Sequence, residues 1–148
     1  MTAATLALVV TQTEAAQVLA AGLRLVRGEK LPPGTVVFST GSGSVAAVHA
    51  LPGGADSLAR SVSTVLRGVP VVLITREEDR LTAVRWRGGA AGESLAPGLL
   101  LSTLDDRIED LLIGGVGLAS VPDVIEVAAL GRWRAAKLLA AARRAPRR

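Results

Sequence analysis

Residues 69–88 constrain the fold of this chain more than any other stretch, because their sequence, VPVVLITREEDRLTAVRWRG, sets two apolar runs on either side of four charged residues. The first run, 71–75, is aliphatic and β-branched, which is typical of a strand covered on both faces. The second run, 81–86, alternates, so Trp86 and Arg85 fall on opposite faces. The stretch predicts a β-hairpin with its first strand inside a sheet, Trp86 in the core and Arg85 in solvent.

The elements expected before this hairpin form a βαβ unit. Residues 5–11 are an apolar run of strand length, and Thr13 and Glu14 after them are typical of a helix start. A helix over 14–27 and a strand over 35–39 follow. The simplest arrangement of these three elements is a parallel pair of strands with a right-handed crossover.

The remaining patterns complete the expected fold. We expect one compact domain of the α/β (or α+β) class, with a mixed sheet of about four to six strands, helices packed on the sheet and a long C-terminal helix. In chain order, the other expected elements are a helix over 56–67, a loop over 88–98, a short edge strand over 99–101, a helix that begins at the capping box of 103–106 and ends at 114–115, and a last helix from Pro122 to about Arg144.

Composition limits the chemistry that is open to the chain. It has 148 residues, which fits one domain, and it is 49% apolar but only 2% aromatic, so the core is expected to consist of small aliphatic side chains. The absence of cysteine excludes disulfides, thiolate metal sites and a cysteine nucleophile. The start of the chain lacks the features of a signal peptide, and Pro122 and acids interrupt the apolar region 111–130. We therefore expect a cytoplasmic protein without a membrane span.

The sequence Gly41-Ser42-Gly43-Ser44 is the stretch that most resembles a ligand site. A glycine-rich turn after a parallel strand, with a helix starting at Ser44, brings backbone N–H groups and a helix dipole to a phosphate or another small anion. The stretch lacks the third glycine of a dinucleotide fingerprint and the Gly-Lys-Ser/Thr of a P-loop, and its residues are also ordinary turn formers. If 45–51 is a strand, the glycines form a hairpin turn and the anion site disappears.

His49 is the single histidine of the chain and is the other candidate ligand-binding residue. Its apolar neighbours favour a partly buried side chain. Paired with Ser42 or Ser44, it is the one acyl-transfer pair that the sequence offers. An orienting acid is not evident, and Asp56 or Ser57 supplies the third group only if the turn before it folds back. We therefore predict no catalytic residue.

Two groups of acids suggest a metal site but have a simpler explanation. Glu77, Glu78 and Asp79 alternate with arginines in the expected hairpin turn, and the other group favours a helix N-terminus and a solvated helix face. The second group consists of Asp105, Asp106, Glu109 and Asp110. We expect no metal and no cofactor.

The basicity of the chain is concentrated at its end. The net charge is +4, yet residues 132–148 hold seven cations and no acid, so we divide the chain into an α/β domain over 1–131 and a basic helix end and tail over 132–148. Cations and an indole in this segment suit phosphate backbones or anionic lipid, with a subunit contact or a solvated tail as alternatives. The candidate nucleic-acid-binding residues are Arg132, Trp133, Arg134, Lys137, Arg143 and Arg144.

These observations favour a non-enzymatic module that acts through self-association, as a homo-oligomer, or through binding of a partner. The high apolar content favours an apolar surface covered by another subunit. One alternative is binding of a phosphorylated small molecule or nucleotide at 41–44. A second is nucleic-acid binding through the C-terminal arginines.

Overall fold

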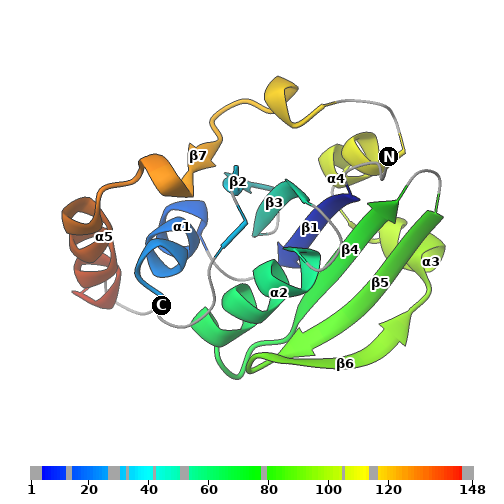
Figure 1. Ribbon diagram of the computed structural model, residues 1–148, viewed down its shortest axis with the longest axis horizontal. Helices are drawn as coiled ribbons and strands as arrows, with labels where there is room; N and C mark the ends of the chain where they lie inside the picture. Colours follow the sequence, from blue (N-terminus) through cyan, green and yellow to red (C-terminus); the bar gives the residue numbers. More distant parts are fainter. Residues whose placement is uncertain are drawn as a thin grey trace.

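The computed structural model of the chain describes residues 5–12, 15–26, 31–32, 34–41, 43–50, 54–77, 80–104, 106–113 and 117–144. Within these residues, seven strands form one sheet in the order β6-β5-β4-β1-β3-β2-β7 (Figure 1). The strands are β1 (Thr5–Thr11), β2 (Val36–Ser39), β3 (Ser44–Ala50), β4 (Val71–Glu77), β5 (Arg80–Arg87), β6 (Ala90–Leu95) and β7 (Ile125–Glu126). The helices are α1 (Ala16–Leu25), α2 (Gly54–Val65), α3 (Pro97–Leu101), α4 (Asp106–Leu112) and α5 (Arg132–Arg144), with 3-10 turns η1 (Leu118–Ser120) and η2 (Val127–Ala129).

The predicted class, one compact domain of helices on a sheet with a C-terminal helix, is confirmed, whereas the predicted sheet differs in two respects. Every strand pairing in the described part of the chain is antiparallel, so the sheet is not mixed. It also has seven strands instead of four to six. The additional strands include β6, which had been expected to be a loop, and the short edge strand β7.

The predicted parallel pairing of the first two strands is wrong, because β3 lies between them. β1 pairs with β3 and β3 pairs with β2, both antiparallel, so β1 and β2 run in the same direction without touching. The chain returns after β2 through a short turn, and closing a short loop costs little entropy. Elements β1 to β4 with α1 and α2 therefore form a βαββαβ unit of ferredoxin-like topology, which β5, β6 and β7 extend at both edges.

The sheet is covered on both faces. On the α1/α2 face, Ala7 and Val9 of β1 pack with Leu19 and Leu58 of the helices, and Trp86 lies in this layer as predicted. The opposite face, the α3/α4 face, is covered by α3, α4 and Val121. Its buried residues are Leu6, Leu8, Val10, Phe38, Val45, Ala47, Ile74, Ala83, Leu101, Ile108, Leu111, Leu112 and Val121. Alternation along β1 therefore sorts side chains between two cores, whereas on β5 Trp86 is buried and Arg85 is exposed, as predicted.

Helix α1 is buried on several sides. It lies between the sheet, α2 and α5, and Figure 1 shows α5 against its outer side. Its buried residues are Ala16, Leu19, Ala20, Ala21, Gly22 and Leu23. The small residues permit close packing: a Cβ at Gly22 would lie 2.6 Å from a methyl of Val65 in α2. The predicted helix start, Thr13 and Glu14, lies outside the described residues.

The expected loop over 88–98 and strand over 99–101 are a hairpin and a helix. Gly88 and Gly89 both adopt positive φ, as a two-residue hairpin turn requires, and Arg87 then pairs with Ala90 at the start of β6. Pro97 begins α3, where its missing N–H costs nothing. The Gly-Gly pair was therefore the informative signal in this small-residue stretch.

The last helix begins at Arg132, ten residues later than Pro122, where it was expected. Asp123 adopts a positive φ of 58°, which a helix does not tolerate, and β7 pairs with the edge of β2. The carbonyl of Gly131 accepts the first helical hydrogen bond, from the N–H of Ala135 at 2.9 Å. Gly131 therefore precedes the helix instead of interrupting it.

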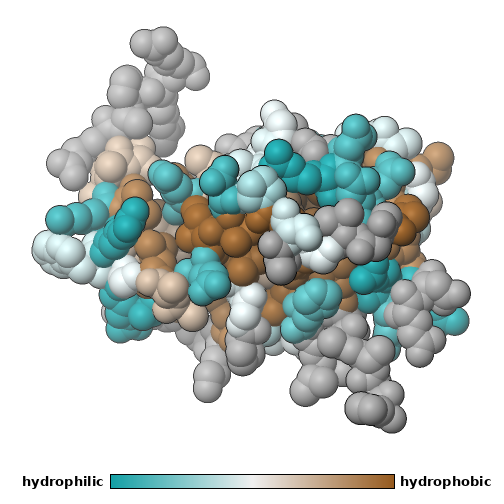
Figure 2. All heavy atoms as spheres, turned by 90° about the horizontal axis from the view of Figure 1, so that it is seen from above, coloured by the Kyte–Doolittle hydropathy of each residue, from teal (hydrophilic) through white to brown (hydrophobic). Residues whose placement is uncertain are grey.

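Large apolar side chains also reach the surface. The most exposed are Leu99 in α3, Ile113 directly after α4 and Trp133 in α5, at 77%, 61% and 75% of their full exposure. Seen from above, apolar surface lies in the middle of the molecule, between hydrophilic side chains on either side (Figure 2). Among the described helices, none has the length and apolar character needed to cross a membrane.

Candidate functional site

The glycine-serine stretch at 41–44 is the turn of the β2–β3 hairpin. Ser39 pairs with Ser44, and the N–H of Thr40 donates to the carbonyl oxygen of Gly43 at 2.9 Å. Ser44 begins a strand, so the helix that was to direct its dipole at an anion is absent from the described structure. Ser42 lies outside the described residues. Ligand binding by Gly41, Ser42, Gly43 and Ser44 remains a prediction. The parallel strand and the helix N-terminus on which it was based are not found in the described structure.

Gly43 and Ser44 have packing roles that explain their presence. The Thr11 hydroxyl lies 2.9 Å from the Ser44 hydroxyl and donates to the Ser44 carbonyl at 3.1 Å, and both side chains are buried. A Cβ at Gly43 would lie 2.7 Å from Cα of Gln12. The turn is therefore packed directly against the chain that leaves β1.

His49 is exposed, not partly buried as expected, and it lies near the other end of β3 from Ser44. Five residues along a strand span roughly 17 Å, too far for a hydrogen bond between the two side chains. His49 pairs with Leu6 and so points to the α3/α4 face, whereas Asp56 and Ser57 lie on α2 over the opposite face. The structure therefore does not bring Ser44 and His49 together with Asp56 or Ser57, and the pairing with Ser42 lies outside the described residues.

The two acidic groups do not converge in the part of the chain that is described. No set of three or more His, Cys, Asp or Glu side chains there is placed to hold a metal ion. Glu78, Asp79 and Asp105 lie outside the described residues.

The C-terminal cations lie on α5, which is anchored to α1 through Ala135, Leu138 and Leu139. Around the helix axis, Arg132 and Arg134 are about 160° apart, because each residue advances by about 100°. They flank a solvent-facing sector that carries Trp133 and Lys137, and the Lys137 ammonium lies 5.5 Å from the centre of the Trp133 ring. The side chains of Arg143 and Arg144 lie outside the described structure. Four of the six predicted residues, Arg132, Trp133, Arg134 and Lys137, thus form a row across one exposed helix face.

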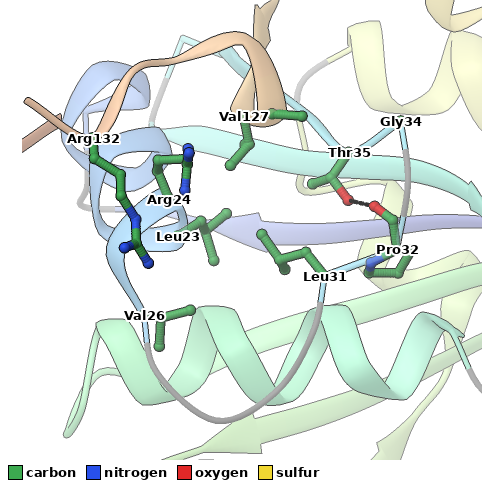
Figure 3. A pocket seen from close by; sticks show the side chains of 10 residues that line it. Leu23, Arg24, Val26, Leu31, Pro32, Gly34, Thr35, Val127 and Arg132 are labelled. Atoms are coloured by element: carbon green, nitrogen blue, oxygen red, sulfur yellow. Dashed lines mark hydrogen bonds between the residues drawn. The ribbon is translucent and has the colours of Figure 1, made fainter. Parts of the chain in front are cut away.

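A pocket of about 360 Å³ lies where the end of α1 meets residues 31–32 and 34–35, η2 and the start of α5 (Figure 3). Leu23, Leu31 and Val127 point into it, and Arg24 and Arg132 lie at its α1 side. The Arg24 Nε donates to the Leu130 carbonyl at 2.8 Å, and the Thr35 hydroxyl donates to the Pro32 carbonyl at 2.7 Å. The lining residues are Leu23, Arg24, Val26, Leu31, Pro32, Gly34, Thr35, Val127, Ala128 and Arg132.

A second hollow of about 270 Å³ lies across η2 from the first. It contains Arg134 of α5 together with Glu126 and Gln17, over apolar residues of β7 and α5. Arg132 and Arg134 therefore line different pockets, which their angular separation on α5 explains.

Sequence reasoning missed Arg24 as a candidate. It is the single charged residue of α1, whose sequence is otherwise apolar or amide, AQVLAAGLRL. A single cation in a helix that is otherwise suited to burial is the feature of the sequence that could have marked Arg24 as a candidate. Its partner Leu130 lies 106 residues away, so the pocket itself was not visible in the sequence.

Comparison with known proteins adds no assignment: the chain matches no protein-family model, no curated protein and no solved structure.

Proposed function

We propose that the protein is a non-enzymatic binding module whose partner is nucleic acid, held by the exposed face of α5. The observation that carries this proposal is Trp133, which is 75% exposed and has a lysine ammonium 5.5 Å from its ring centre. An indole in water next to cations suits stacking on an unpaired base, with Arg132, Arg134 and Lys137 near the phosphates.

The placement of α5 favours nucleic acid over an anionic membrane. A helix that lies in a membrane surface inserts an apolar face among the lipids. The apolar face of α5, with Ala135, Leu138 and Leu139, is already packed against the domain. What remains exposed is a row of cations around one indole, and this supports a polyanion as the partner.

Replacing Trp133 with alanine is expected to weaken binding of a fluorescently labelled single-stranded oligonucleotide by about tenfold, because one stacked base contributes roughly 1–3 kcal/mol. The dependence of affinity on salt should be unchanged. Replacing Lys137 with glutamine should instead reduce the slope of log affinity against log salt by about 0.7. Fluorescence anisotropy of the full chain over a salt series measures both.

Arg80→Gln serves as the control, because this exposed cation lies at the start of β5, away from α5. It should alter neither quantity beyond a small general effect. Equal affinity of the wild type and of the Trp133→Ala and Lys137→Gln variants would contradict the proposal, as would absence of binding at low salt. The proposal carries with it a cytoplasmic location, where nucleic acid is accessible.

Self-association is a second candidate function, and the exposure of Leu99 and Ile113 supports it. These apolar residues lie on the segments that cover the α3/α4 face. Pairing of β6 edges is less favourable, because a bulge and the Arg85–Glu93 ion pair interrupt that edge.

A homo-oligomer formed through these residues is expected to dissociate in the Leu99→Ser/Ile113→Ser variant, since each serine removes apolar contact area. Multi-angle light scattering on the full chain gives the subunit number of both forms. The same number before and after substitution would argue against this surface as the contact.

A further inference from the structure

The pocket between α1 and η2 has the dimensions of a small-ligand site. Its volume is about 360 Å³, near the lower end of the roughly 300–1,000 Å³ that such sites occupy. Its walls come from four separate parts of the chain, namely the end of α1, residues 31–32 with 34–35, η2 and the start of α5 (Figure 3). This volume fits a small metabolite better than a dinucleotide.

The apolar walls of the pocket are fixed by the core. Leu23 and Val127 belong to the cluster of buried residues on the α1/α2 face, and Leu31 packs against that cluster. Such walls favour the apolar body of a ligand.

Arg24 supplies an oriented positive charge. It is half-buried, and its Nε donates to the Leu130 carbonyl at 2.8 Å, which fixes the guanidinium between α1 and the end of η2. The terminal nitrogens carry further N–H donors in a rigid fork that suits carboxylate or phosphate oxygens.

Neither Arg24 nor Arg132 has an ion-pair partner among the residues that the structure describes. Arg24 is half-buried, and an anionic group in the pocket would compensate its guanidinium for the water that burial removes. Both arginines line the pocket, and Figure 3 shows both side chains on the same side of it.

We propose that this pocket binds a small molecule with an anionic head, a carboxylate or a phosphate, and an apolar body. Arg24 and Arg132 bind the head, and Leu23, Leu31 and Val127 contact the body. The site shares Arg132 with the proposed nucleic-acid face of α5, whereas Arg24 takes no part in that face, so the Arg24→Gln variant separates the two functions.

Isothermal titration calorimetry of the full chain with octanoate, octyl phosphate and 1-octanol tests the proposal. At least one of the two anions should bind at least tenfold more tightly than the neutral alcohol. The tighter of the two identifies the head group as carboxylate or phosphate. Absence of binding by both anions at millimolar concentration, or equal binding of the alcohol, overturns the proposal.

The Arg24→Gln and Arg132→Gln variants assign the two charges, and each should weaken binding of the preferred anion about tenfold. Arg132 is exposed, so its replacement tests the site even if the loss of the Arg24–Leu130 hydrogen bond perturbs folding. Arg80→Gln should leave the affinity unchanged. If the Arg132→Gln variant and a folded Arg24→Gln variant both bind the anion with wild-type affinity, the two arginines do not bind its head group.

Discussion

Replacing Gly43 with alanine is expected to lower the free energy of unfolding by about 3 kcal/mol, at the upper end of the usual cost of overpacking. The new Cβ would lie 2.7 Å from Cα and 2.8 Å from the carbonyl carbon of Gln12, and closer still to the carbonyl oxygen of Thr11. These backbone atoms cannot rotate away as a side chain can. Relief requires separating the β2–β3 turn from the end of β1, where Thr11 and Ser44 share buried hydrogen bonds.

Thermal or urea unfolding followed by circular dichroism measures this effect, and a loss of this size lowers the melting temperature by roughly 10 °C. Gly117→Ala is the matched control, because a Cβ at Gly117 meets no atom within 4 Å and its φ of −84° suits alanine. Equal stability of the two variants would show that the turn yields without cost. A loss of ligand binding on substitution of Gly43 is therefore no evidence for an anion site at 41–44, since the same substitution disturbs the fold.

The hairpin over 69–88 was predictable because the residues that determine it are close together in the sequence. The register pairs Val71 with Trp86 and Glu77 with Arg80, so alternation within a few residues fixed which side chains point to the core. The pattern indicated that the first strand is covered on both faces, but not which elements cover it. Arg76 shows the consequence: it belongs to β4 and donates to the carbonyls of Leu111 and Leu112 at the end of α4.

The stretch 44–50 could not be assigned from its own residues. Its sequence, SVAAVHA, is a short apolar run, and such runs suit a buried strand or a helix equally well. The strand results from pairing with β1 on one side and β2 on the other, which are contacts that only the assembled sheet supplies. The prediction of a ligand loop depended on this one choice.

The edge strand β6 was missed for a different reason, namely that its sequence shows no strand pattern. It is exposed along nearly its whole length, so neither face needs apolar side chains. Its sequence, AAGESL, therefore lacks the apolar alternation that predicts a strand. The pocket with Arg24 was similarly out of reach, because its walls are brought together by contacts between the end of α1 and a segment about a hundred residues later. Local patterns thus predicted most helices and strands, but neither the strand order nor the pocket.

Removal of residues 132–148 is expected to destabilise the protein by about 3–5 kcal/mol, although sequence alone suggested a separable basic end. Ala135 on α5 is fully buried, and Leu138 and Leu139 pack against the same core as Leu19 and Leu23 of α1. Each apolar side chain returned to water costs roughly 1–3 kcal/mol, and the exposed surface of α1 adds to this. Urea unfolding of the truncated and full chains gives the difference.

The full chain with Arg132, Arg134 and Lys137 all changed to glutamine is the matched control. These side chains are exposed, so the variant should unfold within about 0.5 kcal/mol of the wild type while losing the positive charge of the α5 face. If the truncated chain is as stable as the full chain, α5 is not part of the fold and 1–131 is an independent domain. If it is destabilised, loss of nucleic-acid binding on truncation cannot be assigned to charge, and only the full-length glutamine variant separates binding by α5 from its role in covering α1.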